Sequence, residues 1–242
     1  MIGRLLMVEV LKLNGSLAAL LMVVAPGMIG VLCFLAPVAS NTAPPWGEIL
    51  SLATSLWAFF MLPMATTALT TLVAQIEYKP KAWDHLLSLP VRRWQVYAAK
   101  ALVVIGAVAV MTALVFGFAW LGATLGGLLA PERAPTGQFP WRRVAEGGVT
   151  LFAAALLLVM LLLWTALRFA SFVVPLATGI GATLLGLAVM ITRTDKADFF
   201  PTLLPVKALN SPDPTPYLLT GAIGGAVVLV LMVIDLSHRE MR

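Results

Sequence analysis

The residue types that usually carry enzyme chemistry are sparse in this sequence. Among its 242 residues there are two histidines, His85 and His238, and one cysteine, Cys33. The sequence contains no H-E-x-x-H or G-x-S-x-G motif and no phosphate-binding G-x-x-x-x-G-K-[ST] loop. We therefore expect no catalytic residues, no metal ligands and no cofactor on this chain.

The densest group of functional side chains lies in residues 77–100, EYKPKAWDHLLSLPVRRWQVYAAK. Five of the sixteen basic residues of the chain fall here: Lys79, Lys81, Arg92, Arg93 and Lys100. Trp83, Leu86, Leu87 and Pro90 follow the i, i+3, i+4, i+7 spacing of one helical face. An apolar face within a charged segment is typical of a loop whose Trp lies in the lipid headgroups. It is equally typical of a helix that docks into a partner protein.

The rest of the chain is too apolar for a soluble protein. Hydrophobic residues make up 60% of it and charged residues 11%, whereas soluble domains carry about 25% charged residues. Six uncharged runs each reach the roughly 20 residues that cross a bilayer as a helix. We predict an all-α polytopic membrane protein, 1–242 forming one domain, with spans at 17–39, 50–75, 101–126, 147–167, 171–192 and 217–235.

The basic residues predict how these spans are oriented. With the N-terminus in the cytoplasm, the cytoplasmic side carries ten of them: Arg4, Lys12, Lys79, Lys81, Arg92, Arg93, Lys100, Arg168, Arg239 and Arg242. The other side carries six: Arg133, Arg142, Arg143, Arg193, Lys196 and Lys207. This asymmetry predicts that both termini and the 77–96 loop are cytoplasmic. Since the basic residues lie in short loops beside apolar runs, we expect a lipid bilayer and no nucleic acid as partner.

Two further segments are predicted to be amphipathic. In residues 1–13, Arg4, Glu9 and Lys12 fall within about 140° of a helical wheel, which favours an interfacial helix leading into the first span. Residues 194–216 place apolar side chains at roughly helical spacing between prolines. This segment is predicted either to form a short helix on or in the outer leaflet, or to be an ordered loop capping the bundle.

The interior of the spans offers little polar chemistry. No span has an ionisable residue near its middle, which indicates that any transport is powered elsewhere. Pro63 predicts a kink in the second span, because it leaves the carbonyl of Phe59 without its helical donor. Four threonines follow at i, i+4 spacing and either bond carbonyls of their own helix or line a substrate path: Thr66, Thr67, Thr70 and Thr71.

The charged loop carries a family resemblance. It is similar to the first cytoplasmic loop of ABC-2 family permeases, and closest to their lantibiotic-immunity branch, in Glu77, Trp83, Leu86, Leu87, Leu89-Pro90-Val91, Arg93, Tyr97 and Lys100. The six spans and the amphipathic N-terminal segment also resemble that family. Asp84 departs from it, since the branch often carries Lys there, and the charge around the docking face differs accordingly.

This resemblance implies the permease subunit of an ATP-driven exporter for an amphiphilic peptide or antibiotic-like substrate. It further implies a second permease subunit, a separate ATPase that holds ATP and Mg²⁺, and a prokaryotic cytoplasmic membrane. The ATPase would dock on a short coupling helix through Trp83, Asp84, Leu86, Leu87 and Pro90. The loop would be anchored by Glu77, Arg92, Arg93 and Lys100, with Glu77 and Lys100 paired at the ends of spans 2 and 3. The alternative is a membrane scaffold or assembly factor that recruits a cytoplasmic partner through the same loop.

Overall fold

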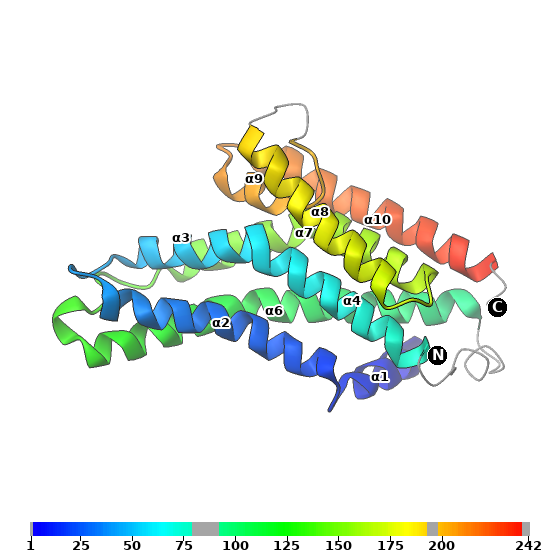
Figure 1. The fold of residues 1–242 in the computed structure, drawn as a ribbon, viewed down its shortest axis with the longest axis horizontal. Helices are drawn as coiled ribbons and strands as arrows, with labels where there is room; N and C mark the ends of the chain where they lie inside the picture. Colours follow the sequence, from blue (N-terminus) through cyan, green and yellow to red (C-terminus); the bar gives the residue numbers. More distant parts are fainter. Residues whose placement is uncertain (1, 79–91, 193–197, 239–242) are drawn as a thin grey trace.

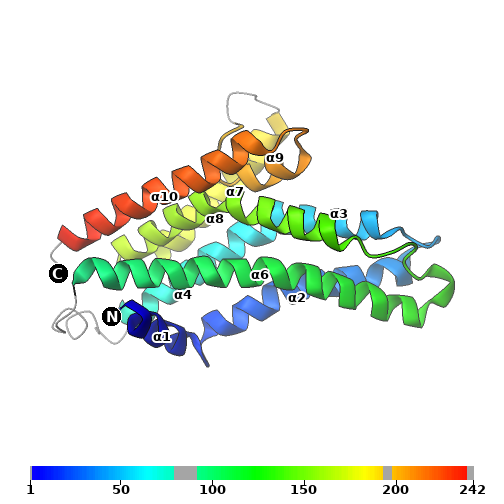
Figure 2. The ribbon, with the colours of Figure 1, turned by 180° about the vertical axis from the view of Figure 1, so that it is seen from behind.

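The computed structural model describes residues 2–78, 92–192 and 198–238, which fold as a bundle of helices without a β-strand (Figures 1 and 2). Within these ranges, six helical stretches are long and apolar enough to cross a membrane. The predicted all-α, six-span architecture is therefore confirmed. The stretches are Leu17–Ala39, Trp46–Tyr78, Arg93–Leu129, Trp141–Arg168, Val173–Thr192 and Thr215–His238.

The first two helices lead the chain into the bundle. Helix α1 (Ile2–Leu13) is followed by α2 (Leu17–Ala39), whose N-cap Ser16 accepts a hydrogen bond from the amide of Ala19. Helix α2 packs along α6 (Arg93–Leu129). A Cβ atom added at Gly122 of α6 would lie 2.1 Å from the carbonyl oxygen of Gly30 in α2. The two backbones therefore meet so closely that only glycine fits at this position.

The second span is bent, as Pro63 predicts. It consists of α3 (Trp46–Leu56), the π-helical turn η1 (Trp57–Met61) and α4 (Leu62–Tyr78). Pro63 has no N–H to offer the carbonyl of Phe59, and the adjacent turn widens so that Leu62 donates to the carbonyl of Trp57, five residues back. Figure 1 shows the change of direction between α3 and α4.

The second half of the chain forms a tight helical pair. Helices α7 (Trp141–Arg168) and α10 (Thr215–His238) pack together at Gly221 and Gly225, a G-x-x-x-G spacing that allows two helices to approach closely. A Cβ at Gly221 would lie 2.5 Å from the carbonyl oxygen of Ala153 in α7. The backbones of α7 and α10 are therefore in close contact at these glycines.

The remaining helices complete the bundle. A short turn, η2 (Pro131–Arg133), follows α6, and α8 (Val173–Thr192) packs against α4. Of the predicted segment 194–216, residues 198 onward are described and include the short helix α9 (Leu204–Asn210). Leu204 and Ala208 of α9 are buried against Ala154 of α7. A short helix is therefore present, and it packs on the bundle.

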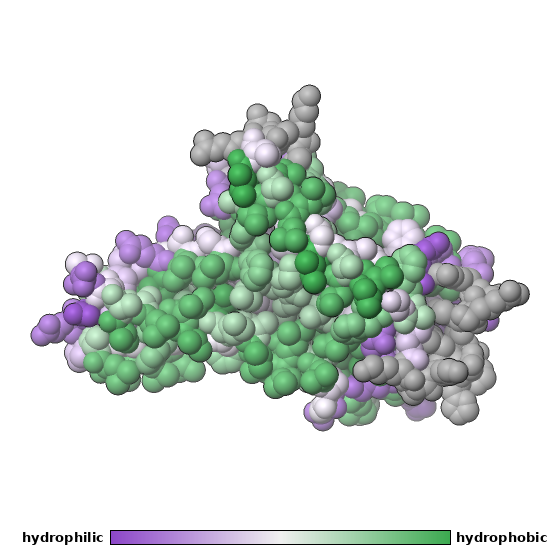
Figure 3. All heavy atoms as spheres, viewed as in Figure 1, coloured by the Kyte–Doolittle hydropathy of each residue, from purple (hydrophilic) through white to green (hydrophobic). Residues whose placement is uncertain are grey.

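The ends of the bundle differ in what they bring together. The N-terminus, the C-terminal end of α10 and the ends of α4 and α6 that flank residues 79–91 lie at one end, here called the loop end (Figure 1). The opposite end, here called the far end, holds the turns between α2 and α3 and between α6 and α7. Figure 3 shows hydrophobic residues over the middle of one face and hydrophilic ones towards both ends, the distribution expected of a membrane protein.

The helix bounds shorten the predicted loop. Residues 77 and 78 belong to α4, and α6 begins at Arg93, well before the predicted start of span 3 at residue 101. Residues 93–96 are therefore helical, and Arg93 and Lys100 belong to α6. Span 3 was predicted from a run of uncharged residues, and the charged and aromatic side chains in the first part of α6 interrupt such a run. The hydropathy pattern therefore missed this part of the helix.

Candidate functional site

The predicted docking residues Trp83, Asp84, Leu86, Leu87 and Pro90 lie outside the described residues, and their role stays a prediction. Both flanks of the loop are described. Helix α4 ends at Tyr78, and Arg92 is the N-cap of α6, followed by Arg93. Both arginine side chains are exposed, at the surface beside the loop.

Four charged side chains meet between α1, α4 and α6 and are here called the charge cluster: Glu9, Lys12, Glu77 and Lys100. The Nζ atom of Lys100 lies 2.6 Å from Oε2 of Glu9 and 3.3 Å from Oε1 of Glu77. The Nζ atom of Lys12 lies 2.9 Å from Oε1 of Glu9 and 2.6 Å from Oε1 of Glu77. The pairing expected between Glu77 and Lys100 is thus part of a larger, charge-balanced group.

Three members of the charge cluster are buried, and Lys12 is partly exposed. Lys100 is fully buried, and Glu77 and Glu9 are 1% and 6% exposed. An ionised group in such a place is tolerated only when opposite charges and hydrogen bonds compensate the loss of water. Each of the four groups here has two opposite charges within ion-pair distance. The cluster therefore joins three helices at the loop end and penalises any movement that separates them.

Helix α1 directs Glu9 and Lys12 towards the protein, whereas Arg4 is exposed. Glu9 is buried, while Met7, Val8, Val10 and Leu11 are roughly half exposed or more. The sequence grouped Glu9 and Lys12 with Arg4 on a polar face, without showing that Glu9 and Lys12 bind partners on other helices. An apolar outer face with Glu9 and Lys12 held inward is consistent with a helix lying on the bundle at the membrane interface.

The groups of α1 are held in their charged forms. Burial alone raises the pKa of the Glu9 carboxyl, but the charge and hydrogen bond of Lys100, together with Lys12, outweigh it and leave the pKa below its ordinary value. Burial alone lowers the pKa of Lys12, but hydrogen bonds to Glu77 and Glu9 raise it above its ordinary value overall. At neutral pH both groups therefore contribute full charges to the cluster.

A second polar group ties α4, α7 and α10 together at the loop end. The hydroxyl of Tyr78 donates to the carbonyl of Leu167 at 2.6 Å. Arg168, at the end of α7, pairs with Asp235 of α10. The indole Nε1 of Trp164 donates to the same carboxylate at 2.8 Å. Ion pairs and hydrogen bonds between side chains of different helices thus hold the loop end together on both of its sides.

The four threonines of α4 are buried in the bundle. Their exposed fractions are 1% or less. The hydroxyls of Thr67, Thr70 and Thr71 donate to the carbonyls of Pro63, Thr66 and Thr67, one turn earlier. A Cβ at Gly179 of α8 would lie 2.1 Å from Oγ1 of Thr67, so α8 packs directly on this face. These contacts match the packing alternative, and a substrate path along the threonines, including Thr66, stays a prediction.

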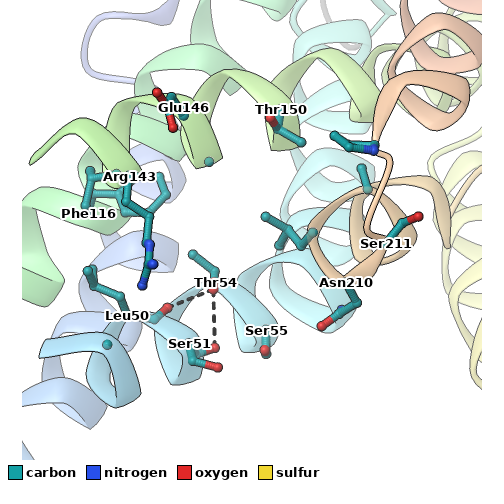
Figure 4. A pocket seen from close by; sticks show the side chains of 16 residues that line it. Leu50, Ser51, Thr54, Ser55, Phe116, Arg143, Glu146, Thr150, Asn210 and Ser211 are labelled. Carbon is teal, nitrogen blue, oxygen red and sulfur yellow. Dashed lines mark hydrogen bonds between the residues drawn. The ribbon is translucent and has the colours of Figure 1, made fainter. Parts of the chain in front are cut away.

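A polar pocket of about 440 Å³ opens near the far end between α3, α7 and α9. Figure 4 shows the side chain of Arg143 extending from α7 towards α3. Ser51, Thr54 and Ser55 line the α3 side. Thr54 donates to the carbonyls of Leu50 and Ser51 at 2.7 and 3.3 Å. The pocket therefore presents hydroxyls and a guanidinium, in a bundle whose other surfaces are mostly apolar.

An apolar groove of about 470 Å³ adjoins this pocket. It runs between α6 and α7 and is lined by Ala113, Gly117, Trp141, Phe152 and neighbouring apolar residues. Phe116 and Val144 line the pocket and the groove alike. The two hollows are therefore neighbours on either side of these side chains.

The family comparison matches this architecture. Residues 5–188 match the model of a family described as ABC-2 family transporter protein, from α1 to near the end of α8. The chain belongs to the ABC-2 transporter family. No curated protein and no solved structure matches the chain.

Membership of the ABC-2 family identifies the six-span bundle as a permease subunit of an ABC transporter, which is a membrane transport component and not itself catalytic. An ABC-2 permease implies a transport system with an ATPase partner in a lipid membrane. Across residues 2–78, 92–192 and 198–238, no group of three His, Cys, Asp or Glu side chains lies close enough to hold a metal ion.

Sequence reasoning missed several polar residues of the ABC-2 permease. Glu9 and Lys12 gave a signal, because charges three residues apart in an otherwise apolar segment are costly in a membrane unless they are paired. Arg168 was counted only among the basic residues of the cytoplasmic side, and Asp235 is the last residue of the sixth predicted span. Arg143 gave no usable signal, since its pocket combines helices that are far apart in the sequence.

Proposed function

We propose that this ABC-2 permease belongs to an exporter that moves an amphiphilic peptide or antibiotic-like compound out of the membrane or the cell. In this proposal it pairs with a second permease subunit, and a separate ATPase subunit supplies the energy. It lies in a prokaryotic cytoplasmic membrane with both termini in the cytoplasm, where the basic residues favour them. The resemblance of its loop to the lantibiotic-immunity branch supports a role in resistance to such an antibiotic.

The charge cluster is the observation that carries this proposal. Glu77 stands one residue before the end of α4, and Lys100 lies two turns into α6, so the cluster joins both helices that flank the loop. Lys12 and Glu9 add α1 to the same unit. When the ATPase subunits close on ATP and push on the loop, this unit transmits the force to α1, α4 and α6 together.

The distribution of ionisable residues supports an external energy source. The sequence places none near the middle of a span, whereas ion-coupled transporters generally use buried ionisable groups as coupling sites. The sequence also lacks a phosphate-binding loop of its own. Both properties suit a permease that receives its energy from a bound ATPase.

The test is affinity purification of the tagged chain from its native membranes. We expect an ATPase subunit with a phosphate-binding loop to co-purify in about equal amount and to hydrolyse ATP. A partner without ATPase activity would favour the scaffold alternative. Recovery of the folded chain without an ATPase would contradict the proposal.

The docking role of the loop is tested by the double substitution Trp83→Ala and Leu87→Ala. We expect this variant to lose most of the ATPase while reaching the membrane at the wild-type level. The matched control is Trp94→Ala with Leu102→Ala, because these side chains are of the same types and are 40% and 47% exposed on α6. Equal retention of the ATPase by both variants would contradict docking through the loop.

A further inference from the structure

Arg143 belongs to neither the charge cluster nor the loop at the opposite end of the bundle. Among the described residues, no carboxylate forms an ion pair with it, whereas Arg142 beside it donates from Nε to Oε1 of Glu146 at 2.8 Å. Among the described residues that line the pocket, Glu146 is the only other charged one, and it is the acceptor of this bond from Arg142. The pocket-lining guanidinium is therefore left available for an anionic group.

The α3 side of the pocket offers further hydrogen-bonding groups. The hydroxyls of Ser51 and Ser55 are exposed and make no hydrogen bond to another described residue. They lie four residues apart, on one face of α3. Exposed hydroxyls in a membrane-spanning helix are costly in lipid without a partner. Together with Arg143 they form a site that can donate to the oxygens of a phosphate or carboxylate (Figure 4).

The groove next to the pocket supplies an apolar surface. It is lined by Ala109, Ala113, Gly117, Val149 and Phe152, among others, and borders the pocket at Phe116 and Val144. Because the pocket and the groove adjoin, one bound molecule can place a polar head in the pocket and an apolar tail in the groove. The groove volume of about 470 Å³ is at the small end of ligand sites, which span about 300–1,000 Å³. It therefore suits one chain better than the two chains of a phospholipid.

We propose that the pocket and groove bind a single-chain anionic amphiphile, with its phosphate or carboxylate at Arg143 and its tail along α6 and α7. This proposal rests on the proposed function, since it names the substrate class that the exporter takes from the membrane. The charge of Arg143 selects the anionic head, and the groove selects the single tail. Substrate binding is thus placed at the far end, away from the charge cluster.

The experiment uses dodecyl phosphate as the probe and native mass spectrometry of the chain in neutral detergent as the readout. We expect saturable binding of one dodecyl phosphate per chain. Dodecyl trimethylammonium, which has the same tail and a cationic head, is expected to bind at least roughly ten-fold more weakly. Inorganic phosphate, which lacks a tail, is expected to compete only weakly.

The head site is tested with Arg143→Gln, which we expect to weaken dodecyl phosphate binding roughly ten-fold or more. Arg133→Gln is the control, since Arg133 lies at the same end of the bundle but lines neither the pocket nor the groove, and it is expected to change binding less than about two-fold. Arg143→Lys retains the charge and is expected to keep most of the affinity. It also tests the site independently if the glutamine variant fails to fold.

The tail site is tested with Gly117→Leu, which places a side chain in the groove. A Cβ at Gly117 meets no atom within 4 Å, and the same is true of Gly106. These glycines are eleven residues apart on α6 and so lie on nearly the same face, but Gly106 is not among the residues that line the groove. We expect Gly117→Leu to weaken dodecyl phosphate binding roughly five-fold and Gly106→Leu to leave it unchanged.

Three results would overturn this inference. Equal binding of the cationic and anionic probes would show that Arg143 does not select an anionic head group. Tight binding of inorganic phosphate, unaffected by Gly117→Leu, would indicate a free-anion site. Binding of dioleoyl phosphatidic acid with the same dependence on Arg143 would identify a bilayer phospholipid in place of a single-chain amphiphile. Because Arg143→Gln leaves the loop intact, retention of the ATPase by that variant separates a failure here from a failure of the proposed function.

Discussion

The two ends of the bundle use charge in opposite ways. At the loop end, Lys100 is buried and lies within 3.3 Å of two carboxylates, which Lys12 also contacts. At the far end, Arg143 lines an open pocket and pairs with no described carboxylate. A charge whose partners lie within the protein stabilises one arrangement of helices, whereas a charge left without a partner can bind a ligand. The contrast is the basis of our proposals that the loop end transmits force and that the far end binds substrate.

The largest expected effect is the removal of a buried charge from the loop end. Lys100→Met leaves Glu9 and Glu77 with only Lys12 to balance them, and we expect it to lower the free energy of unfolding by about 3–5 kcal/mol. Unfolding in mixed detergent micelles measures this change. Lys207→Met is the control, because Lys207 is partly exposed and pairs with Asp198 at 2.6 Å; its expected cost is about 0–1 kcal/mol.

A double variant sharpens this prediction. Adding Glu77→Gln to Lys100→Met restores the balance of charge, leaving Glu9 and Lys12 paired at 2.9 Å. We expect the double variant to be more stable than Lys100→Met alone. The loss in the free energy of unfolding of the double variant is compared with the losses of Lys100→Met and Glu77→Gln measured separately. If it equals their sum, the charge cluster does not act as one unit.

The pH dependence of stability provides the next test. The pKa of Glu9 is lowered from 4.5 in the folded protein, so its contribution is present above that value and is lost as the pH falls through the folded pKa. The pKa of Lys12 is raised from 10.5, so its contribution is lost only as the pH rises through the folded pKa. We measure the thermal midpoint of unfolding as a function of pH and expect it to decrease less at acid pH in Glu9→Gln than in the wild type. An equal decrease in both proteins would show that Glu9 is not held ionised by the cluster.

A smaller effect is expected from the partly exposed pair of α7 and α10. Asp235→Asn removes the charge that pairs with Arg168 but keeps an oxygen that can accept from Trp164. We expect a loss of about 1 kcal/mol in the free energy of unfolding. A loss as large as that of Lys100→Met would show that this pair shares the importance of the charge cluster.

The smallest effect on stability is expected at the far end. Arg143→Gln removes a charge that no described carboxylate balances, and we expect the free energy of unfolding to change by no more than about 0.5 kcal/mol. The same unfolding assay measures it beside Lys100→Met. A large destabilisation would show that Arg143 has a structural role, and the contrast between the two ends would fail.

The sequence predicts the membrane architecture well because span length and hydropathy are local properties. The first span matches its predicted bounds, and Pro63 marks the bend in the second. Pairing is a property of the assembled bundle, so the contacts of Glu9 and Lys12 with α4 and α6 were not predicted. The pocket around Arg143 was missed for the same reason, because its polar side chains come from three separate helices and share no motif.

The most direct test of the central claim, that a separate ATPase drives this permease, is the rate of ATP hydrolysis in lipid nanodiscs. The rate is measured for the ATPase subunit alone, with the wild-type chain, and with the Trp83→Ala, Leu87→Ala variant. The account predicts that the wild-type chain changes the ATPase rate several-fold and that the variant leaves it at the value of the isolated subunit. An ATPase rate that is the same in all three preparations would contradict the account.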